Sequence, residues 1–561
     1  RKPSFYKGYL PKVLFLRVLL ALWPSYVHPD EYFQSQEITA KLVFGLSTYV
    51  PWEFQTESAL RTILTPLCTT GIPYFCLKFL RVPISGQILL TLPRLILAVV
   101  SCTMDLVAFN ICTKFQIEFH DGVGKLLASS WAILVFFSRP FSNTVEALVL
   151  VYSLGVYFLW ENGRTKRIIL GGLLAIGVFS RFTFIAFFLP IGTFLLLDAL
   201  PSKRESKGVP RFNTMQLFVV ALSECMLGSV VTTAVFIYSD WLYYGRLVVT
   251  PLNNFIYNMN SANLALHGLH PRWLHVVVNI PMLCGPFGYY VLYLMYTKVL
   301  RWSSFYKSRR NVWSTFTEKM CRWWQNTGSS SGKARDRLFV EQVELLCILC
   351  VCSGLLVLSL APHQEPRFLL PVVFPICLIA GRHLGHRKHG NPRLIDRLYI
   401  LWIVTNFVLC MLFGVLHQGG VLRSILAIQE SRPFSVIYFH THMPPRFLLL
   451  NAVQREGWGK KPTILLEDLG GSSVDTLQNK LKFHLKRRNE EDLSGKGRPV
   501  WLVAPASLDV SAAIFSVKSF VQEHKGKEKG TVSPTNQIWP HLSMEDLPRT
   551  FGELCLNVYT L

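Results

Sequence analysis

Residues 13–37 read VLFLRVLLALWPSYVHPDEYFQSQE and join an apolar run directly to a cluster of acidic and aromatic residues. The run Val13–Trp23 predicts a membrane helix, and Pro29 disfavours a simple continuation of that helix. Ionised carboxylates at a membrane boundary are costly unless they have partners or a chemical role. Asp30 and Glu31 therefore indicate proton chemistry on one side of a bilayer.

The rest of the chain repeats this apolar character. Hydrophobic residues make up 51% of the 561 residues and charged residues only 16%. The sequence predicts an all-α polytopic membrane protein with about 11 to 13 membrane helices. The expected spans, or parts of spans, are Val13–Trp23, Ile84–Asn110, Leu126–Phe137, Val145–Trp160, Ile168–Phe179, Phe184–Leu200, Leu217–Tyr238, Val276–Leu300, Val343–Leu360, Phe368–Ala380 and Tyr399–Leu416, with the proline-interrupted Ala59–Leu80 as a further candidate.

The net charge of +23 is concentrated in a few loops. Such clusters mark cytosolic loops. The excess of Lys and Arg therefore indicates the orientation of the chain in the membrane and does not indicate a nucleic-acid partner. The basic loops are 164–167, 203–211, 301–337 and 382–397. This rule places Asp30, Glu31 and the tail after Leu416 on the non-cytosolic side. Between residues 57 and 141 the expected spans do not give a consistent order of cytosolic and non-cytosolic loops. We therefore expect a re-entrant or interfacial helix there.

Two domains are expected. Residues 1–430 form the membrane domain, with a luminal catalytic loop at 24–60 and a cytosolic loop at 301–337. Residues 431–561 form a small luminal α/β domain, because short β-rich runs alternate there with helical patterns. The β-rich runs are Ser435–His440, Thr463–Leu469 and Val500–Ala504, and the helical patterns are Val474–Lys486 and Ser511–His524. Gly470 and Gly471 favour a tight turn over a phosphate-binding loop.

The acidic pair is the first candidate for chemistry. A carboxylate here can accept the proton of an attacking hydroxyl group, with Asp30 slightly preferred as the base and Glu31 as the group that orients it. The choice between them stays open. The second carboxylate can orient the base or bind sugar hydroxyls, and His28, Tyr32 and Gln34 lie alongside the pair. A helix N-cap explains the acidic pair equally well when it is taken alone.

Arginines interrupt apolar sequence at two further places. Arg139 and Glu146 flank a turn that also contains Asn143, and Arg181 follows the run at 168–179. An arginine buried between membrane helices needs an anionic partner, which is either a carboxylate or a ligand phosphate. An ion pair between Arg139 and Glu146 is an open alternative to ligand binding.

The string PHQEPRF at 362–368 places polar residues between two strongly apolar runs. His363 and Arg367 can donate hydrogen bonds to a phosphate, and arginine does so in a bidentate manner. Glu365 can position either of them, and Gln364 lies in the same string.

Two other polar regions fit a phosphate or a sugar. His417 and Gln418 follow the last span, and the aromatic, asparagine-rich loop 240–273 contains Tyr257 and Asn258. Aromatic and amide side chains suit a carbohydrate, although an interfacial aromatic belt also explains the rings. No three or four ligands stand at zinc-like spacing, so no metal site is expected.

Five strings taken together carry a family resemblance: HPDEYFQSQE at 28–37, RPFSNTVE at 139–146, HQEPRFLLP at 363–371, HQGG at 417–420 and HTHMPPR at 440–446. They resemble the dolichyl-phosphate-mannose-dependent mannosyltransferases of the GT-C class, glycosyltransferase family 22, which act in N-glycan and GPI-anchor assembly. The likeness is greatest to the members that add the fourth mannose to the GPI precursor. Arg181-Phe182-Thr183 departs from the Arg-Pro-Thr expected there.

The resemblance implies an inverting transfer of mannose from dolichyl-phosphate mannose to the third mannose of a GPI precursor, forming an α1,2 linkage, in the endoplasmic reticulum membrane. It implies no cofactor or metal, and its implied partners are dolichyl-phosphate mannose, the GPI intermediate and membrane lipids, without a nucleic acid. The implied catalytic residues are Asp30 and Glu31; the donor phosphate would contact His363, Gln364, Arg367, Arg139 and His417. Sugar or acceptor contacts would come from His28, Tyr32, Gln34, Asn143, Glu146, Arg181, Glu365, Gln418, Tyr257 and Asn258.

Three alternatives remain at this point. One is a related α1,2-mannosyltransferase that acts on the third GPI mannose or on an N-glycan precursor. Another is a secondary transporter, but no internal repeat is evident and the charges lie at span ends rather than near span centres. The third is a lipid-binding scaffold, which would keep its function when Asp30 and Glu31 are replaced by Asn and Gln.

Overall fold

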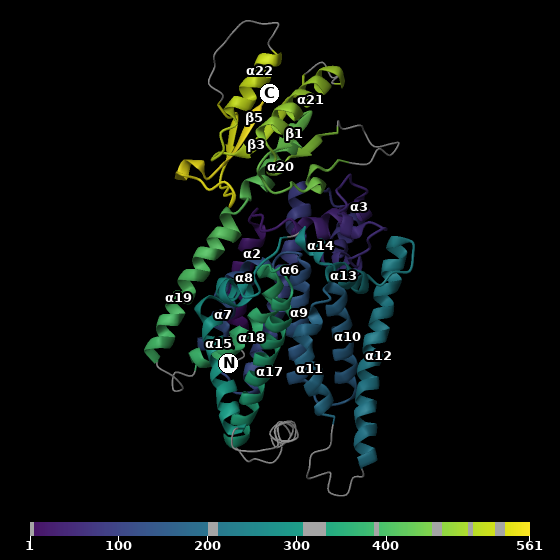
Figure 1. Ribbon diagram of the computed structural model, residues 1–561, viewed down its shortest axis with the longest axis vertical. Helices are drawn as coiled ribbons and strands as arrows, with labels where there is room; N and C mark the ends of the chain where they lie inside the picture. Colours follow the sequence, from purple (N-terminus) through teal and green to yellow (C-terminus); the bar gives the residue numbers. More distant parts are fainter. Residues whose placement is uncertain are drawn as a thin grey trace.

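The computed structural model shows a bundle of long helices with a small sheet at one end (Figure 1). We refer to that end as the sheet end. The structure describes residues 5–199, 211–266, 268–306, 333–385, 392–451, 463–491, 497–521 and 533–561. The predicted cytosolic loop 301–337 falls mostly outside the described residues, as do the basic segments 203–210 and 386–391.

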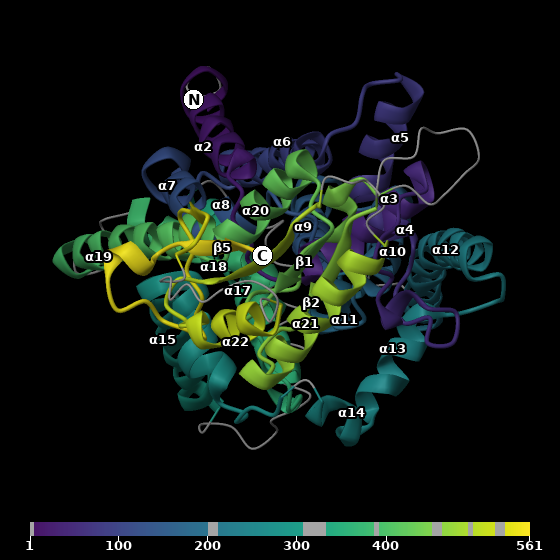
Figure 2. The same cartoon turned by 90° about the horizontal axis from the view of Figure 1, so that it is seen from above.

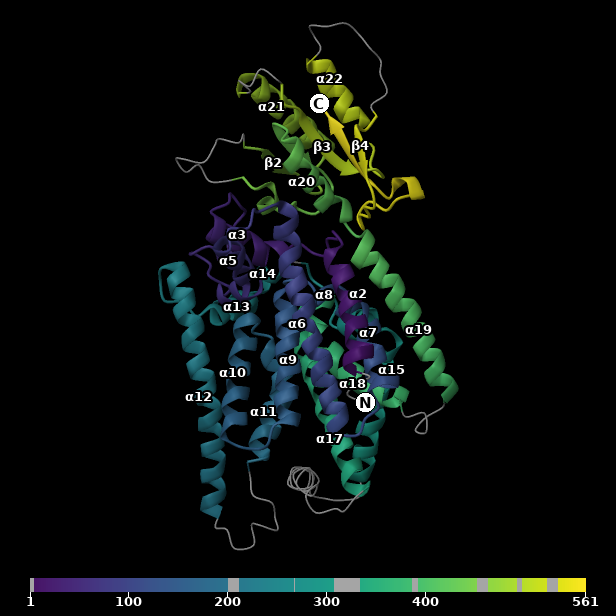
Figure 3. The ribbon, with the colours of Figure 1, turned by 180° about the vertical axis from the view of Figure 1, so that it is seen from behind.

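Seven helices within the described residues are long and apolar enough to cross a membrane. They run roughly along the long axis of the molecule (Figures 1 and 3). These helices are α6 (Gly86–Lys114), α9 (Ser142–Leu159), α12 (Arg211–Tyr244), α15 (Ile280–Tyr306, continuing the π-helical turn η6, His275–Asn279), α17 (Lys333–Leu360), α18 (Leu370–Gly385) and α19 (Pro392–Met411, followed by η9, Leu412–Leu416). Shorter apolar helices join them: α2 (Leu10–Leu22), α10 (Arg164–Ser180) and α11 (Phe184–Leu197). The predicted polytopic α-helical fold is confirmed.

The expected span Leu126–Phe137 is not one helix. It consists of α7 (Gly124–Ser129) and α8 (Trp131–Phe136), preceded by η5 (Phe119–Val123), and it breaks at Ser130, where ψ is 116°. The side chain of Asn406 accepts a hydrogen bond from the backbone N–H of Trp131 at 2.8 Å. Because a neighbouring helix satisfies the interrupted backbone, the break is tolerated inside the bundle.

The candidate span Ala59–Leu80 is helical only in part. α4 (Leu64–Pro66), η4 (Leu67–Gly71) and α5 (Ile72–Phe79) follow one another without a gap, and the helical stretch 64–79 is shorter than the about 20 residues that a bilayer requires. It lies at the sheet end beside η2 (Tyr32–Gln36) and α3 (Glu37–Phe44) (Figure 3). The irregular region expected between 57 and 141 therefore comprises this segment and the α7–α8 break.

Helix α12 stands at the periphery and leads into α13 (Thr250–Met259) and α14 (Ser261–Ala265) (Figure 2). It packs on α10 through glycines at a very short interhelical distance. A Cβ atom added at Gly171 would lie 1.9 Å from the carbonyl oxygen of Cys225, and one added at Gly228 would lie 1.9 Å from that of Ile168. Only glycine allows this approach, which brings α13 over the end of α10.

The C-terminal part carries five strands in the order β2-β1-β3-β5-β4. Strands β1 (Ser435–Tyr438), β2 (Leu465–Asp468) and β3 (Val500–Pro505) are parallel, while β5 (Leu556–Thr560) is antiparallel to β3 and β4 (Asn536–Ile538) is antiparallel to β5. Helices α20 (Gly419–Ser431), α21 (Val474–Glu491) and α22 (Ser511–Val521) accompany them. The first three strands match the predicted runs, whereas β4 and β5 were not predicted.

One buried carboxylate joins the two parts. Glu37 of α3 accepts backbone hydrogen bonds from Tyr49 at 3.1 Å, from Phe447 at 3.2 Å and from Arg446. Arg446 and Phe447 begin η10 (Arg446–Leu449), which follows β1. The carboxyl end of β1 is therefore fastened to the helix that follows the acidic pair.

Candidate active site

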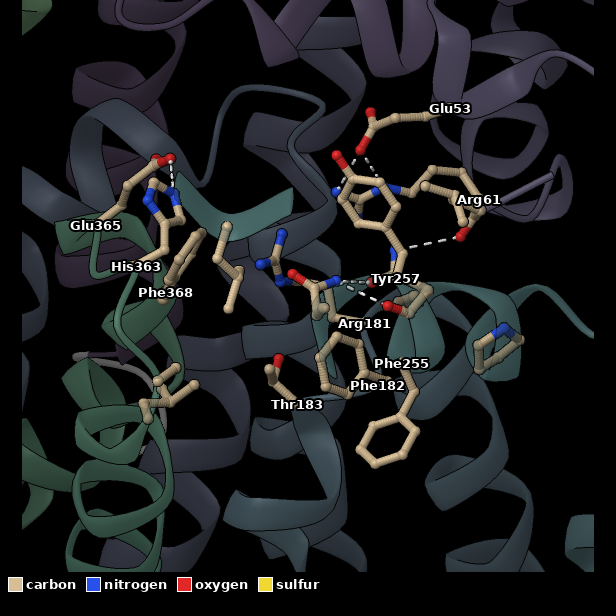
Figure 4. Close-up of a pocket in the computed structure, with 18 of the residues that line it drawn as sticks. Glu53, Arg61, Arg181, Phe182, Thr183, Phe255, Tyr257, His363, Glu365 and Phe368 are labelled. Carbon is tan, nitrogen blue, oxygen red and sulfur yellow. Dashed lines mark hydrogen bonds and ion pairs between the residues drawn. The ribbon is translucent and has the colours of Figure 1, made fainter. Parts of the chain in front are cut away.

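A cavity of about 760 Å³ lies between the first polar segment, the α10–α11 turn, α13 and the end of α17. Figure 4 shows His363, Glu365 and Phe368 on one wall, Glu53, Arg61 and Tyr257 on the opposite wall, and Arg181 between them. Nine of the predicted site residues line it: His28, Asp30, Gln34, Arg181, Tyr257, Asn258, His363, Glu365 and Arg367. Segments that are hundreds of residues apart thus meet at one cavity.

Asp30 lines this cavity, with 22% of its side chain exposed. Its Oδ2 atom accepts hydrogen bonds from Nη1 of Arg367 at 2.5 Å and from Nε2 of Gln34 at 2.8 Å. Burial alone would raise the pKa of Asp30, but the Arg367 guanidinium opposes it and holds that pKa below the ordinary value. Asp30 is therefore an ionised carboxylate, able to accept a proton.

His28 beside it acts as a hydrogen-bond acceptor through Nδ1. That atom accepts from Nη1 of Arg367 at 3.0 Å and from the backbone N–H of Asp30 at 3.2 Å. Burial, together with the Arg367 charge, lowers the pKa of His28 to about 4. The ring is neutral near pH 7 and carries its proton on Nε2, so it can donate only from that atom.

The PHQEPRF string forms a turn ending in η8 (Pro366–Leu369). His363 and Glu365 are 2.9 Å apart (Nε2 to Oε1), and the other Glu365 oxygen pairs with Nε of Arg367. Burial of Glu365 opposes ionisation, but Arg367 and His363 together hold its pKa well below the ordinary value. The hydrogen bond to Glu365 raises the pKa of His363, against burial. Glu365 thus positions both cationic side chains.

Gln364 of the same string points elsewhere. It is buried, its Oε1 accepts from the backbone of His275 at 3.0 Å, and its Nε2 donates to carbonyls of Arg272, Ser359 and Ala361. In this arrangement Gln364 holds the turn together and does not line the cavity.

Glu31 also lies outside the cavity lining, in a fully buried ionic cluster. Its carboxylate contacts Nε of Arg94 at 2.7 Å and Nε of Arg139 at 3.4 Å. Arg94 further donates to the hydroxyl of Tyr32. Hence Arg139 and Tyr32 belong to this cluster as well. Arg94 was not predicted, because it lies singly within the apolar run of α6.

The predicted alternative of an Arg139–Glu146 pair is not what forms. Glu146 instead contacts Nε of Arg181 at 3.5 Å and accepts from the hydroxyl of Thr183 at 2.8 Å. Arg181 also lies 3.4 Å from Oδ1 of Asn143 and stacks over the ring of Phe368, 4.7 Å from its centre. Glu146 and Asn143 therefore orient Arg181, which lines the cavity.

His417 and Gln418 lie at the junction with the sheet. Nδ1 of His417 bonds the carbonyl of Tyr26 at 2.7 Å, and Gln418 accepts from the backbone of His442 at 3.4 Å. Burial lowers the pKa of His417. His417 thus fastens the start of α20 to the first polar segment, and Gln418 fastens it to the segment after β1; neither residue lines the cavity.

The wall formed by Glu53 and Arg61 was missed. Glu53 accepts from Nε2 of Gln34 at 2.9 Å and pairs with Arg61 at 3.0 and 3.1 Å. It follows Pro51-Trp52 in η3 (Trp52–Phe54). A Trp-Glu pair in the expected catalytic loop was the available signal, but it matches no string of the family resemblance.

The asparagines of α13 make hydrogen bonds within the protein. Asn253 donates to the carbonyl of Ala59 at 3.1 Å and Asn254 to that of Leu60 at 3.3 Å, while Asn258 donates to Asn254 at 2.8 Å. These bonds fasten α13 to the segment after Glu53. Tyr257 and Asn258 are thereby held at the cavity.

An ionised carboxylate and a cluster of cationic side chains share one cavity, which fits group transfer from an anionic leaving group. Residues 10–446 match the Alg9-like mannosyltransferase family. The chain belongs to this family. The membership confirms the resemblance to the GT-C mannosyltransferases and identifies the protein as a glycosyltransferase.

Several curated members of the family are similar over most of this chain. Human GPI alpha-1,2-mannosyltransferase 4 is 28% identical, covering 95% of this chain and 88% of the relative. GPI mannosyltransferase 4 of Eremothecium gossypii is 30% identical over 78% of this chain and 76% of the relative, and that of Candida glabrata is 27% identical over 94% of both. The crystal structure of ArnT from Cupriavidus metallidurans bound to undecaprenyl phosphate superposes with a TM-score of 0.45 at 12% identity, covering 99% of this chain and 98% of ArnT.

Within the described residues no group of three or more His, Cys, Asp or Glu side chains is arranged to hold a metal ion. His363 and Glu365 use each other and Arg367 as partners. The cavity therefore offers arginine and histidine donors for an anion.

Proposed function

We propose that this glycosyltransferase moves mannose from dolichyl-phosphate mannose to the third mannose of a GPI precursor, forming an α1,2 linkage at the luminal face of the endoplasmic reticulum membrane. One observation carries the proposal. The carboxylate of Asp30 lies in the same cavity as Arg367 and His363, as a proton acceptor and a phosphate site must. The GPI mannosyltransferase names of the relatives support the acceptor assignment.

The reaction needs one base. The acceptor hydroxyl oxygen attacks C1 of the mannosyl group while its proton passes to an Oδ atom of Asp30. The bond between C1 and the phosphate oxygen breaks on the opposite face, and its electron pair leaves with dolichyl phosphate. The configuration at C1 inverts, so no covalent enzyme intermediate forms.

The leaving phosphate gains negative charge as that bond breaks. Arg367 can donate two parallel hydrogen bonds to it, and protonated His363 can donate a third. Glu365 holds both donors in place through its contacts with them. Arg181, which lies between the two walls of the cavity, adds a further positive charge.

Arg367, which pairs with Asp30, is also the proposed hydrogen-bond donor to the phosphate. A phosphate competes with Asp30 for the guanidinium of Arg367, and the carboxylate then loses its nearest cation. Loss of that cation raises the proton affinity of Asp30. Donor binding would thus prepare the base for the acceptor hydroxyl.

The distribution of charge supports the proposed luminal placement. Lys7 and Lys12 lie at the start of α2, opposite to Asp30 at its other end, and basic residues cluster in alternate loops. The excess of Lys and Arg marks the cytosolic side. The cavity and the sheet then share the luminal side.

The test is transfer by the purified protein in liposomes that contain dolichyl-phosphate mannose. Three acceptors are compared by mass spectrometry: a three-mannose GPI intermediate, a two-mannose GPI intermediate and an N-glycan precursor. We expect one added hexose on the three-mannose acceptor, released by an α1,2-specific mannosidase. Transfer only to one of the other acceptors would favour the related α1,2-mannosyltransferases, and no transfer to any of them would refute the proposal.

A further inference from the structure

A second, open groove of about 830 Å³ lies beside the cavity. The two share three lining residues, Trp52, Leu60 and Tyr257. The groove continues along α13 and α14, and its other lining residues are Ser58 of the segment after η3, together with Asn253, Ile256, Asn260, Asn263 and Leu266. Asp30, Arg367 and His363 line the cavity only, so the groove offers a binding surface next to the reacting groups.

The aromatic pair at the boundary is suited to a sugar ring. The rings of Trp52 and Tyr257 lie 5.0 Å apart, centre to centre, and are inclined by 44°. Trp52 is 37% exposed, so part of its face is open. Aromatic faces pack against the C–H groups of a pyranose, and each nearby amide or hydroxyl can donate to or accept from its hydroxyl groups.

The rest of the cavity offers a different surface. Its apolar lining comes from Val357, Leu358 and Leu360 at the end of α17, and from Phe255 and Met259 of α13. We refer to these side chains as the apolar flank, and they suit a hydrocarbon chain. The groove adds four polar side chains, Ser58, Asn253, Asn260 and Asn263, to the aromatic pair, and so it suits a glycan.

We propose that the groove holds the sugars of the acceptor that precede the mannose receiving the transfer, with Trp52 and Tyr257 packing against the sugar at the boundary. This inference rests on the proposed function, since it requires an oligosaccharide acceptor. According to this inference, Trp52 favours longer acceptors over shorter ones.

The groove is held in shape by the contacts around it. Phe54, two residues after Trp52, is buried, and Glu53 is paired with Arg61. Asn253 fixes α13 to Ala59, and Asn263 donates to the carbonyl of Tyr257 at 3.0 Å. Each of these amides uses one donor hydrogen and retains other hydrogen-bonding capacity for a ligand. A preformed surface costs little conformational entropy when a glycan binds.

The test compares Trp52→Ala with wild type on two acceptors, the three-mannose GPI glycan and a single α-mannoside, both with dolichyl-phosphate mannose as donor. Wild type is expected to favour the longer acceptor. Loss of the stacking surface should raise KM for the long acceptor by about fivefold to tenfold. KM for the donor and the rate on the short acceptor should change by less than about twofold, within the scatter of surface substitutions.

Two further variants separate recognition from folding. Trp52→Phe retains an aromatic face and should recover most of the preference for the long acceptor. Trp539→Ala removes a tryptophan that is 57% exposed, in the C-terminal part and outside the lining of both surfaces, and should leave the preference unchanged. Thermal unfolding of all variants confirms that each is folded.

Failure of the inference and failure of the proposed function give different results. If wild type transfers mannose but Trp52→Ala keeps the same ratio of kcat/KM values for the two acceptors, the groove does not bind the glycan. An equal loss on both acceptors would also overturn the inference. If wild type transfers to neither acceptor, the proposed function itself is wrong.

Discussion

Arg367 donates a hydrogen bond to Asp30 at 2.5 Å, although 337 positions separate them in the sequence. The pair joins the segment after the first membrane helix to the turn between α17 and α18. Two strings that carry the family resemblance, HPDE and HQEPRF, therefore form one site. The predicted proton acceptor is therefore adjacent in space to the side chains that are predicted to donate hydrogen bonds to the phosphate.

Asp30→Asn should abolish turnover while leaving the fold intact. The amide oxygen can still accept from Arg367, so the local contacts survive, but the amide cannot take the proton of the acceptor. We expect kcat to fall by about 100-fold to 10,000-fold. The measurement is the initial rate of mannose transfer at saturating donor and acceptor. A variant that keeps a tenth or more of the wild-type rate would show that Asp30 is not the base.

Glu31→Gln should mainly affect stability. The substitution leaves the buried guanidinium groups of Arg94 and Arg139 without their shared carboxylate. Removing one partner of a buried ion pair costs about 3–5 kcal/mol. We therefore expect a lower unfolding temperature and poor recovery of Glu31→Gln, compared with an unchanged unfolding temperature for Asp30→Asn. A stable, folded but inactive Glu31→Gln protein would instead point to Glu31 as the base.

The pH dependence of kcat/KM should have an alkaline limb set by His363. Its pKa is raised by the contact with Glu365, so the protonated form persists above the ordinary value and is lost as pH rises through the raised pKa. Activity should fall with that loss, and His363→Gln should flatten the limb and lower the maximum. The pKa of Asp30 is held below its ordinary value, so its acid limb should lie below about pH 4. An alkaline limb that is identical in His363→Gln would contradict the assignment.

Glu37 should control how firmly the sheet is fastened to the membrane domain. Glu37→Ala leaves three backbone N–H groups without an acceptor, of which that of Phe447 is buried and costs about 1–3 kcal/mol. Glu37→Gln keeps one oxygen for Arg446 and Phe447 and loses only the bond to Tyr49. We expect proteolytic cleavage after residue 430 to accelerate strongly in Glu37→Ala and weakly in Glu37→Gln. Equal cleavage rates in both variants and wild type would show that the carboxylate is dispensable.

The fold was predictable where one physical signal dominates. Apolar length located α6, α9, α17 and α18, because crossing a bilayer demands about 20 apolar residues whatever their partners are. The break at Ser130 was not predictable, because it depends on Asn406, a residue far away in sequence. Likewise β4 and β5 are short and pair only through distant neighbours, so local alternation gives them little signal.

The candidate site was also predictable only where a local signal is strong. Asp30, Glu365 and Arg367 stand out because charge between apolar runs is costly without a role. The sequence did not show that Glu31 turns into the bundle toward Arg94, since adjacent residues at a helix start point in different directions. It also missed Glu53 and Arg61, whose polar surroundings make a charged side chain unremarkable. Which carboxylate meets which arginine is decided by tertiary packing.

The apolar flank of the cavity bears on how substrates reach this enzyme. Val357, Leu358 and Leu360 lie at the end of a membrane helix, and Leu360 is 68% exposed. Lipid-linked substrates would enter sideways from the bilayer, by diffusion in two dimensions. The encounter rate would then depend on their surface density in the leaflet. Mixing in inert phospholipid should slow turnover, whereas diluting the whole vesicle suspension with buffer should leave the rate per enzyme unchanged.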